Sequence, residues 1–120
     1  MDPVVALTRA LVDIDSTTGH EAEAGRYLVQ HLRKLNFSVT ELPVDGHRFN
    51  ILATMGRPSV VFSTHVDCVP PFFPSRVEGD RLFGRGACDA KGILAAQVAA
   101  ADRFRQRGDS RIGLLFLVGE

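Results

Sequence analysis

The spacing of apolar residues along the chain predicts helices that alternate with strands. Asp2 and Pro3 are typical of an N-cap and a first helical position, and apolar residues follow at helical spacing as far as Ile14. Residues 16–19 interrupt this pattern, and a second amphipathic helix is predicted over residues 21–35. The chain therefore opens with two helices that each carry an apolar face.

Strands are predicted after these helices. Residues 38–44 alternate between apolar and polar side chains, as in a half-buried strand, and residues 50–55 form a second strand. Residues 59–63 contain an apolar run that favours a fully buried strand. A hairpin is then predicted over residues 76–83, with its turn at residues 78–80.

The last third of the chain predicts one long helix and one buried strand. Asp89 is expected to cap a helix that runs to about Arg107, and residues 108–110 end it. Residues 112–118 are apolar throughout, which is typical of a strand in a parallel sheet. Helices that alternate with buried strands favour an α/β fold in three layers, α/β/α, with a mostly parallel sheet in the middle.

The amino-acid composition excludes some classes of binding partner for this chain. The chain has 120 residues, of which 45% are hydrophobic, and a formal net charge of zero. It fits one domain at most and carries no excess charge for nucleic acid or an anionic membrane. No apolar run is long enough to span a bilayer and the start lacks a signal-peptide pattern, so a cytoplasmic location is expected. Its two cysteines, Cys68 and Cys88, are expected to be free thiols.

Candidate chemistry gathers at the ends of predicted strands. His65 and Asp67 follow one apolar strand, and Glu120 follows the last one. Asp89 is brought to the same edge by a glycine-framed turn. Because functional groups in open α/β sheets collect beyond the carboxyl ends of the strands, we expect these four side chains to converge.

The residue types suit a metal site. The imidazole of His65 is a good zinc ligand, and a carboxylate two residues later can hold its second N–H group. The carboxylate of Asp89 can bridge two metal ions that lie about 3.5–4 Å apart. Glu120, beside such a site, can take a proton from a water molecule that the metal activates.

Plainer interpretations of the same residues stay open at this point. A lone His-x-Asp pair is most often a hydrogen-bonded pair in a loop. Asp89 can be explained as the N-cap of a helix, and Glu120 can be explained as a solvent-exposed residue at the end of a strand. Lys91 is expected to point to solvent from the first helical turn, although it could instead orient Asp89. Residues 70–74, Pro-Pro-Phe-Phe-Pro, form either a stiff loop or one wall of a substrate cleft.

Taken together, the motifs resemble those of the zinc-dependent amidohydrolase and metallopeptidase family that includes acetylornithine deacetylase, succinyl-diaminopimelate desuccinylase, aminoacylase and glutamate carboxypeptidase. The likeness covers nearly the whole chain, and the order and spacing of its motifs are specific. It rests on residues 11–19 (LVDIDSTTG), 63–70 (STHVDCVP), 82–92 (LFGRGACDAKG) and 116–120 (FLVGE).

The resemblance implies a role for each candidate residue. His65 and Asp89 would be metal ligands, with Asp89 as the bridge between two ions, and Asp67 would orient His65. Glu120 matches the family's general base. A cis peptide bond between Asp89 and Ala90 is also implied. The family's other metal ligands would lie outside these 120 residues, so metal affinity of this stretch alone is expected to be weak.

The resemblance also implies the setting of the site. Residues 1–120 would be the N-terminal part of a zinc-exopeptidase-like catalytic domain, with the lid or dimerisation domain and the rest of the catalytic domain outside them. The whole protein would form a homodimer through its lid domain. Its active site would hold two Zn²⁺ ions, and Co²⁺ is the alternative metal. The protein would hydrolyse the amide bond of an N-acyl amino acid or a small peptide.

Three rival hypotheses remain. The chain could be a folded but inactive remnant of such an enzyme. It could be a phosphate- or nucleotide-binding module built on the turn between Gly84 and Gly86, although the negative charge of Asp89 disfavours this. The third rival is nucleophilic chemistry through Cys88.

Overall fold

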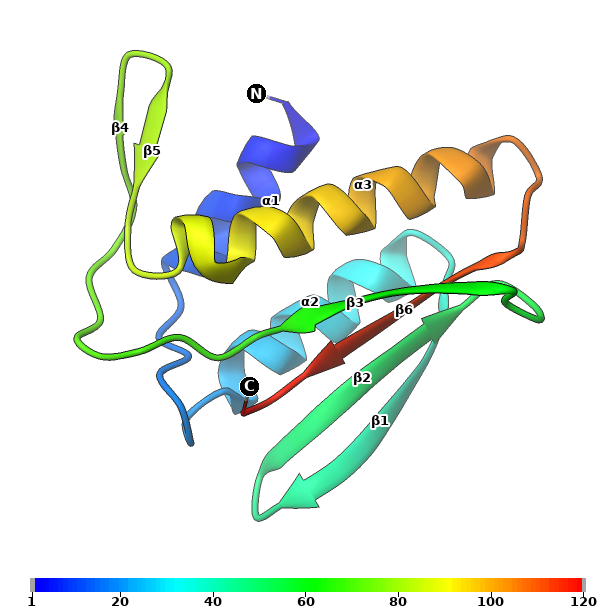
Figure 1. Cartoon of the computed structure of the whole chain (residues 1–120), viewed down its shortest axis with the longest axis horizontal. Helices are drawn as coiled ribbons and strands as arrows, with labels where there is room; N and C mark the ends of the chain where they lie inside the picture. Colours follow the sequence, from blue (N-terminus) through cyan, green and yellow to red (C-terminus); the bar gives the residue numbers. More distant parts are fainter. Residues whose placement is uncertain (1, 120) are drawn as a thin grey trace.

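A four-stranded sheet with helices on one face is the centre of the fold (Figure 1). The computed structural model describes residues 2–119. The strands lie in the order β1-β2-β6-β3, where β1 is Ser38–Asp45, β2 is Arg48–Thr54, β6 is Ile112–Leu117 and β3 is Val60–His65.

The sheet is mixed in direction. β2 is antiparallel to both β1 and β6, whereas β3 is parallel to β6. The α/β class is therefore confirmed, but the expected mostly parallel sheet is corrected to a mixed one over residues 2–119. The first two strands form a hairpin through a two-residue turn, and a turn that short can join only antiparallel neighbours.

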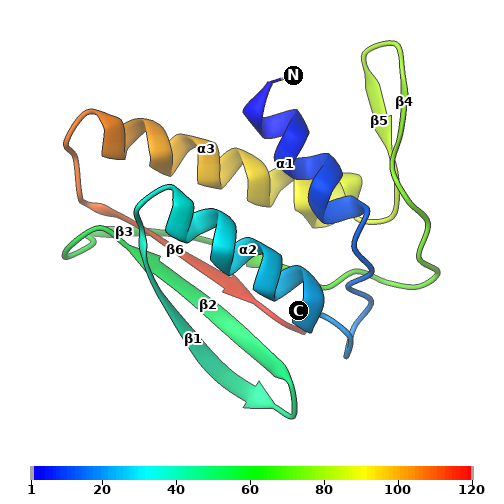
Figure 2. The same ribbon diagram turned by 180° about the vertical axis from the view of Figure 1, so that it is seen from behind.

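Two helices pack on the sheet, and a third packs on those two helices (Figure 2). α2 (Ala22–Lys34) contacts β1 and β2, and α3 (Gly92–Gln106) contacts β3 and β6. α1 (Pro3–Val12) packs against both other helices. Its start is as the sequence predicts, because the carboxylate of Asp2 accepts a hydrogen bond from the Val4 N–H at 2.8 Å.

The hydrophobic core lies between the helices and one face of the sheet. Ile51 of β2 is opposite Phe116 of β6, and Ala53 is opposite Leu114, so these four side chains share that face. All four are fully buried and belong to one cluster with residues of the three helices. The second face of the sheet carries no helix among the described residues, so two of the three expected layers are present there.

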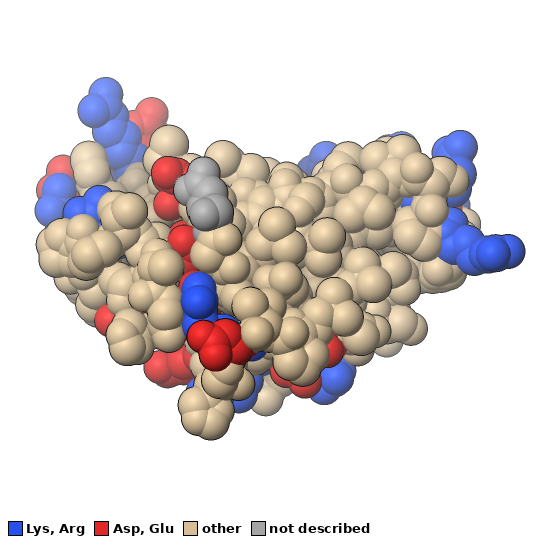
Figure 3. Space-filling model, turned by 60° about the horizontal axis from the view of Figure 1, so that its bottom comes forward, with Lys and Arg blue, Asp and Glu red and all other residues tan. Residues whose placement is uncertain are grey.

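The uncovered face is largely uncharged. Figure 3 looks toward this side and shows a broad area without Lys, Arg, Asp or Glu side chains. Val61, which alternates with the core-facing Phe62 along β3, is 47% exposed. The prediction of a fully buried strand at residues 59–63 is therefore wrong over residues 2–119, where β3 is an edge strand with β6 as its one neighbour and with one open face.

The remaining elements connect β3 to α3. β4 (Arg76–Glu78) and β5 (Arg81–Phe83) form the predicted hairpin, separate from the main sheet. A five-residue π-helical turn, η1 (Ala87–Lys91), then leads into α3. Over residues 2–119, no helix has both the length and the apolar character that a bilayer crossing requires.

Candidate metal centre

The end of β3 and the turn before α3 bring His65 and Asp89 together. His65 is the last residue of β3, and its Nε2 atom lies 2.9 Å from Oδ1 of Asp89. The His65 side chain is 13% exposed, whereas that of Asp89 is 79% exposed. The two side chains line one cavity of about 220 Å³ together with Asp67, Cys68, Val69, Gly84, Arg85, Gly86 and Cys88.

Asp67 holds the other edge of the imidazole ring. The Nδ1 atom of His65 lies 2.8 Å from the backbone carbonyl oxygen of Asp67 and 3.2 Å from its Oδ1. A carbonyl oxygen can only accept, so Nδ1 carries the proton in this contact. The carboxylate of Asp67 also accepts hydrogen bonds from the Gly119 N–H and the Thr18 hydroxyl, each at 3.1 Å. Asp67 is therefore placed where the sequence predicts an orienting residue.

The pairing of His65 with Asp89 fits two ligands of one metal ion. With its proton on Nδ1, the ring presents the lone pair of Nε2 toward a carboxylate oxygen, so a proton or a cation must bring these two acceptors together. Zinc binds nitrogen and oxygen at about 2.0–2.2 Å, and tetrahedral geometry then separates two such ligands by about 3.3 Å. The 2.9 Å contact is close to that separation.

The described residues supply part of a metal site only. No group of three or more His, Cys, Asp or Glu side chains that could hold an ion is present between residues 2 and 119. Glu120, the fourth residue that the sequence singles out, lies outside the described residues. Gly119, which precedes it, is close to the centre through its hydrogen bond to Asp67.

The backbone around Asp89 departs from a helix. Asp89 has φ −125° and ψ 92°, and the peptide bond between Asp89 and Ala90 is cis, as the resemblance implies. The prediction that Asp89 caps the helix is wrong. Neither η1 nor α3 has a side-chain cap, and the Asp89 carboxylate contacts His65 instead. Capping therefore no longer accounts for this residue.

Two glycines allow the tight turn that leads to Asp89. Gly84 has φ +154°, and a Cβ atom there would lie 2.3 Å from Cγ1 of Val12. Gly86 has φ +86°, and its Cβ atom would lie 3.3 Å from Cδ of Lys91. A side chain is excluded at Gly84 by close packing, and at Gly86 it is disfavoured by backbone conformation.

Lys91 lies inside the protein and not on its surface. It is 1% exposed, and its Nζ atom donates a hydrogen bond to the carbonyl oxygen of Ile14 at 2.9 Å. The expectation that Lys91 points to solvent is wrong, because the turn at residues 87–91 directs it toward the end of α1. Burial lowers the pKa of its ammonium group, opposed by attraction to Cys68 and to nearby aspartates.

Two loops that flank the centre are joined through their backbones. The Cys68 N–H donates to the Ser16 carbonyl oxygen at 3.0 Å, and the Thr18 N–H donates to the Cys68 carbonyl oxygen at 3.1 Å. Cys68 is buried and Cys88 is exposed, and both are free thiols, as predicted. The loop after α1 is thereby held beside the loop that follows His65.

Arg85 is a residue of this site that the sequence analysis did not single out. Its Nε atom donates to the carbonyl oxygen of Pro71 at 2.9 Å, and its guanidinium group lies 4.9 Å from the centre of the Phe73 ring. The Pro70–Pro71 bond is cis. Arg85 therefore contacts the segment 70–74 and also lines the cavity that contains His65 and Asp89, whereas residues 70–74 do not line that cavity.

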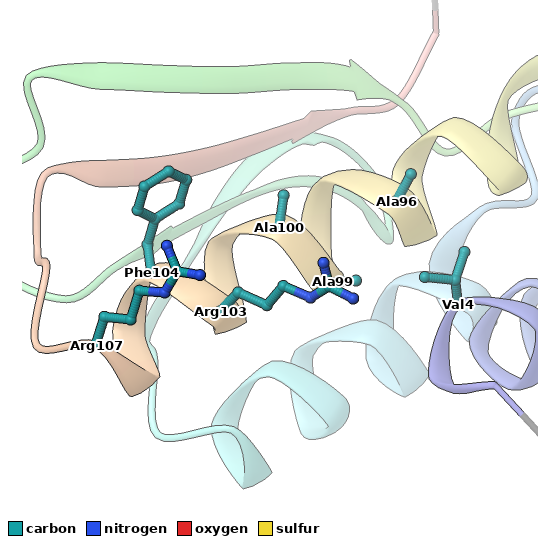
Figure 4. Close-up of a pocket in the computed structure, with 7 residues that line it drawn as sticks. All are labelled: Val4, Ala96, Ala99, Ala100, Arg103, Phe104 and Arg107. Carbon is teal, nitrogen blue, oxygen red and sulfur yellow. The ribbon is translucent and has the colours of Figure 1, made fainter.

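A larger groove lies on α3, away from this centre (Figure 4). Its volume is about 390 Å³, and it is lined by Val4, Ala96, Ala99, Ala100, Arg103, Phe104 and Arg107. These residues include no His, Cys, Asp or Glu, so the groove offers no metal ligand. The smaller cavity is the one lined by His, Cys and Asp side chains.

Known proteins resemble the chain in sequence. The sequence model of the family described as "Peptidase family M20/M25/M40" matches residues 61–120, which contain His65, Asp67, Asp89 and Glu120. A probable carboxypeptidase of Aspergillus terreus is 41% identical over 98% of the chain, and one of Aspergillus clavatus is 39% identical over 98%. The chain covers 31% and 30% of these two proteins, so it spans about a third of the length of the curated relatives.

Solved structures resemble it in fold. A metallo-carboxypeptidase of the M20 family from Sulfolobus solfataricus superposes with a TM-score of 0.84 at 21% identity, over 98% of this chain and 31% of that one. Aminopeptidase PepT from Bacillus cereus gives a TM-score of 0.82 at 25% identity, over 99% of this chain and 36% of that one. The mixed sheet and its helices are therefore an arrangement that occurs within larger peptidase chains.

Proposed function

Because the chain belongs to the peptidase family M20/M25/M40, we propose that it is the N-terminal part of the catalytic domain of a zinc-dependent hydrolase. The whole protein would cleave the amide bond of a small peptide or an N-acyl amino acid. Its relatives are named probable carboxypeptidases, which favours a peptide over an acetylated or succinylated amino acid. A cytoplasmic location and a homodimer formed through a lid domain are further parts of this proposal.

The observation that carries the proposal is the contact between His65 and Asp89. These side chains come from different elements, and their ligand atoms lie 2.9 Å apart at the wall of an accessible cavity. The Nδ1 contact with Asp67 leaves the Nε2 lone pair for a metal ion. A hydrogen-bonded pair in a loop, the plainer interpretation, requires neither this tautomer nor the irregular turn that presents Asp89.

The residues of this chain would divide the work of the reaction. His65 would be a metal ligand through Nε2, and Asp89 would be a ligand that both ions share. When bound, zinc supplies Lewis acidity, which polarises the scissile carbonyl group and makes a water molecule more acidic. Glu120 would take the proton of that water and pass it to the leaving amine. The remaining metal ligands would come from residues outside these 120.

The test uses the full-length protein that carries this chain. We expect it to bind about two zinc ions and to hydrolyse members of a panel of dipeptides and N-acetyl amino acids. His65→Ala and Asp89→Asn should each lower zinc affinity and kcat/KM by at least about 100-fold. His47→Ala is the matched control, because His47 lies in the exposed turn between β1 and β2.

Four results would contradict the proposal. A protein that binds zinc without hydrolysing any substrate would be a non-catalytic remnant. Thermal stabilisation by nucleotides, with no effect of zinc, would favour the nucleotide-binding module. Full activity of the His65→Ala variant would remove the metal centre from the mechanism, and loss of activity in Cys88→Ala would favour thiol chemistry.

A further inference from the structure

A buried ion pair lies behind the candidate centre. The Glu21 side chain is fully buried, and that of Arg48 is 24% exposed. Nε of Arg48 donates to Oε1 of Glu21 at 3.0 Å, and Nη2 donates to Oε2 at 2.9 Å. The Gly19 N–H also donates to Oε1, at 3.0 Å. Such a bidentate pair fixes the plane and the direction of the guanidinium group.

The guanidinium group packs against the segment that follows β6. A Cβ atom added to Gly119 would lie 3.0 Å from Nη2 of Arg48, so the backbone of Gly119 passes directly beside the charged group. Gly119 also has φ +75°, a conformation that glycine adopts readily. On the preceding residue, the Val118 N–H donates to Oδ1 of Asn50 at 2.8 Å. Residues from β2 therefore hold both positions after the last strand.

The contacts then continue from Gly119 to the metal centre. The Gly119 N–H donates to Oδ1 of Asp67, and Asp67 contacts Nδ1 of His65. The pKa of Arg48 is raised, first by its hydrogen bond to Glu21 and also by attraction to the carboxylate of Asp67. Glu21 is thus the direct partner of Arg48, and the Asp67 carboxylate adds a smaller attraction from the neighbouring loop.

Because burying the Glu21–Arg48 ion pair is unfavourable, we expect the pair to have a role other than stabilising the fold. Removing the Glu21 carboxylate from water is costly, and hydrophobic replacement of a buried ion pair is often neutral or stabilising. Neither Glu21 nor Arg48 lines the cavity with His65 and Asp89, so neither is placed to touch a substrate there. The ion pair fixes the orientation of the Arg48 guanidinium group beside Gly119.

We propose that Arg48, held by Glu21, is a positioning residue for the hydrolytic centre. It fixes the backbone of Gly119, whose N–H group holds Asp67 against His65 and from which the chain continues to Glu120. The inference rests on the proposed function, since positioning matters for catalysis only if His65 and Glu120 take part in hydrolysis.

The first experiment measures positioning without activity. Amide hydrogen exchange at Gly119 is compared with exchange at Leu114, in the middle of β6, in the full-length protein. Arg48→Met should speed exchange at Gly119 by at least about 10-fold and leave Leu114 unchanged, since local opening need not lower global stability. Glu21→Gln keeps the size of the side chain, and it serves as the second variant if Arg48→Met does not fold.

The second experiment measures the catalytic consequence. Arg48→Met should lower kcat by about 10–100-fold, the range for residues that orient metal ligands, with KM and zinc content unchanged. Arg111→Met is the matched control, because Arg111 makes a bidentate pair with Asp109 on the surface. That control should leave kcat as it is.

The outcomes separate this inference from the proposed function. If exchange at Gly119 and Leu114 accelerates together, or if only KM changes, the pair stabilises the fold without positioning the centre and the inference fails. If the wild-type protein hydrolyses no substrate, the proposed function fails. In an active protein, unchanged exchange at Gly119 in Arg48→Met would overturn the positioning role alone, and selective acceleration with a lower kcat would support it.

Discussion

Lys91 donates a hydrogen bond from its buried ammonium group to the carbonyl oxygen of Ile14, 77 positions earlier in the chain, at 2.9 Å. The bond joins the turn that carries Asp89 to the end of α1. It also satisfies a carbonyl group just beyond that helix, where the helical ladder has stopped. A charge inside the protein thus anchors the part of the backbone that presents a proposed metal ligand.

This burial predicts a distinctive dependence of stability on pH. Because burial lowers the pKa of Lys91 below 10.5, the unfolded chain binds more protons than the folded one between the lowered value and 10.5. The free energy of unfolding should therefore rise with pH through that window, as the penalty for a buried charge is lost. Lys91→Met should lack this rise. Urea unfolding at several alkaline pH values, under reducing conditions, tests this, and parallel pH curves would contradict it.

Gly84 is predicted to tolerate no side chain. In Gly84→Ala the new Cβ atom would lie 2.3 Å from Val12, so the free energy of unfolding should fall by about 1–3 kcal/mol or more through overpacking. Gly79→Ala is the control, since Gly79 also has a positive φ but has open space around it. It should cost about 1–2 kcal/mol through its backbone alone. Denaturant unfolding compares the two, and equal losses would show that packing at Gly84 is unimportant.

The sequence predicts the elements well because helical and alternating periods are local properties. The three helices, the hairpin and the central strand β6 lie within a few residues of their predicted bounds. Strand order and direction depend on contacts between distant segments, and no period in the sequence encodes them. The run Val60–Phe62 shows the limit, because an apolar edge strand and a buried central strand have the same pattern.

Leu114 is predicted to be a main contributor to stability. It is fully buried in β6 and belongs to the core cluster that both sheet-covering helices share. Leu114→Ala should lower the free energy of unfolding by about 2–5 kcal/mol, through lost burial and the cavity left behind. Val61→Ala, on the open face, should cost less than about 1 kcal/mol. Chemical denaturation of both variants measures this, and similar losses would contradict the one-sided core.

The surface pair of Asp109 and Arg111 gives a titration that can be checked directly. Hydrogen bonds from Arg111 lower the pKa of Asp109 from 3.8 to about 2. Their contribution to stability is therefore present above pH 3.8 and is lost as the pH falls through about 2. Carboxyl NMR should give a midpoint near 2 in the wild type and a higher one in Arg111→Met, in which only the backbone N–H of residue 111 still donates to the carboxylate. An unchanged midpoint in that variant would exclude the arginine as the cause.

The candidate centre is predictable from sequence only in its chemical groups. His65, Asp67 and Asp89 stand out as residue types at informative spacings, and the structure brings all three to one cavity. Lys91 does not stand out, because its partner is a backbone carbonyl group and every residue has one. Arg48 is missed for a related reason, since its two contacts, with Glu21 and Gly119, are 27 and 71 positions away in the chain.

The position of β6 also sets the order in which this structure can form. Among the described strands, β6 comes last in sequence, yet it is the only neighbour that β2 and β3 share. A growing chain could pair β1 with β2 early, but β3 has no partner among the described strands until Ile112–Leu117 has been made. Closing the sheet therefore requires contacts of long sequence separation, which slows folding and leaves the apolar edge of β3 exposed meanwhile. A nascent chain that stalls before Ile112 would keep His65 on an unpaired, aggregation-prone strand.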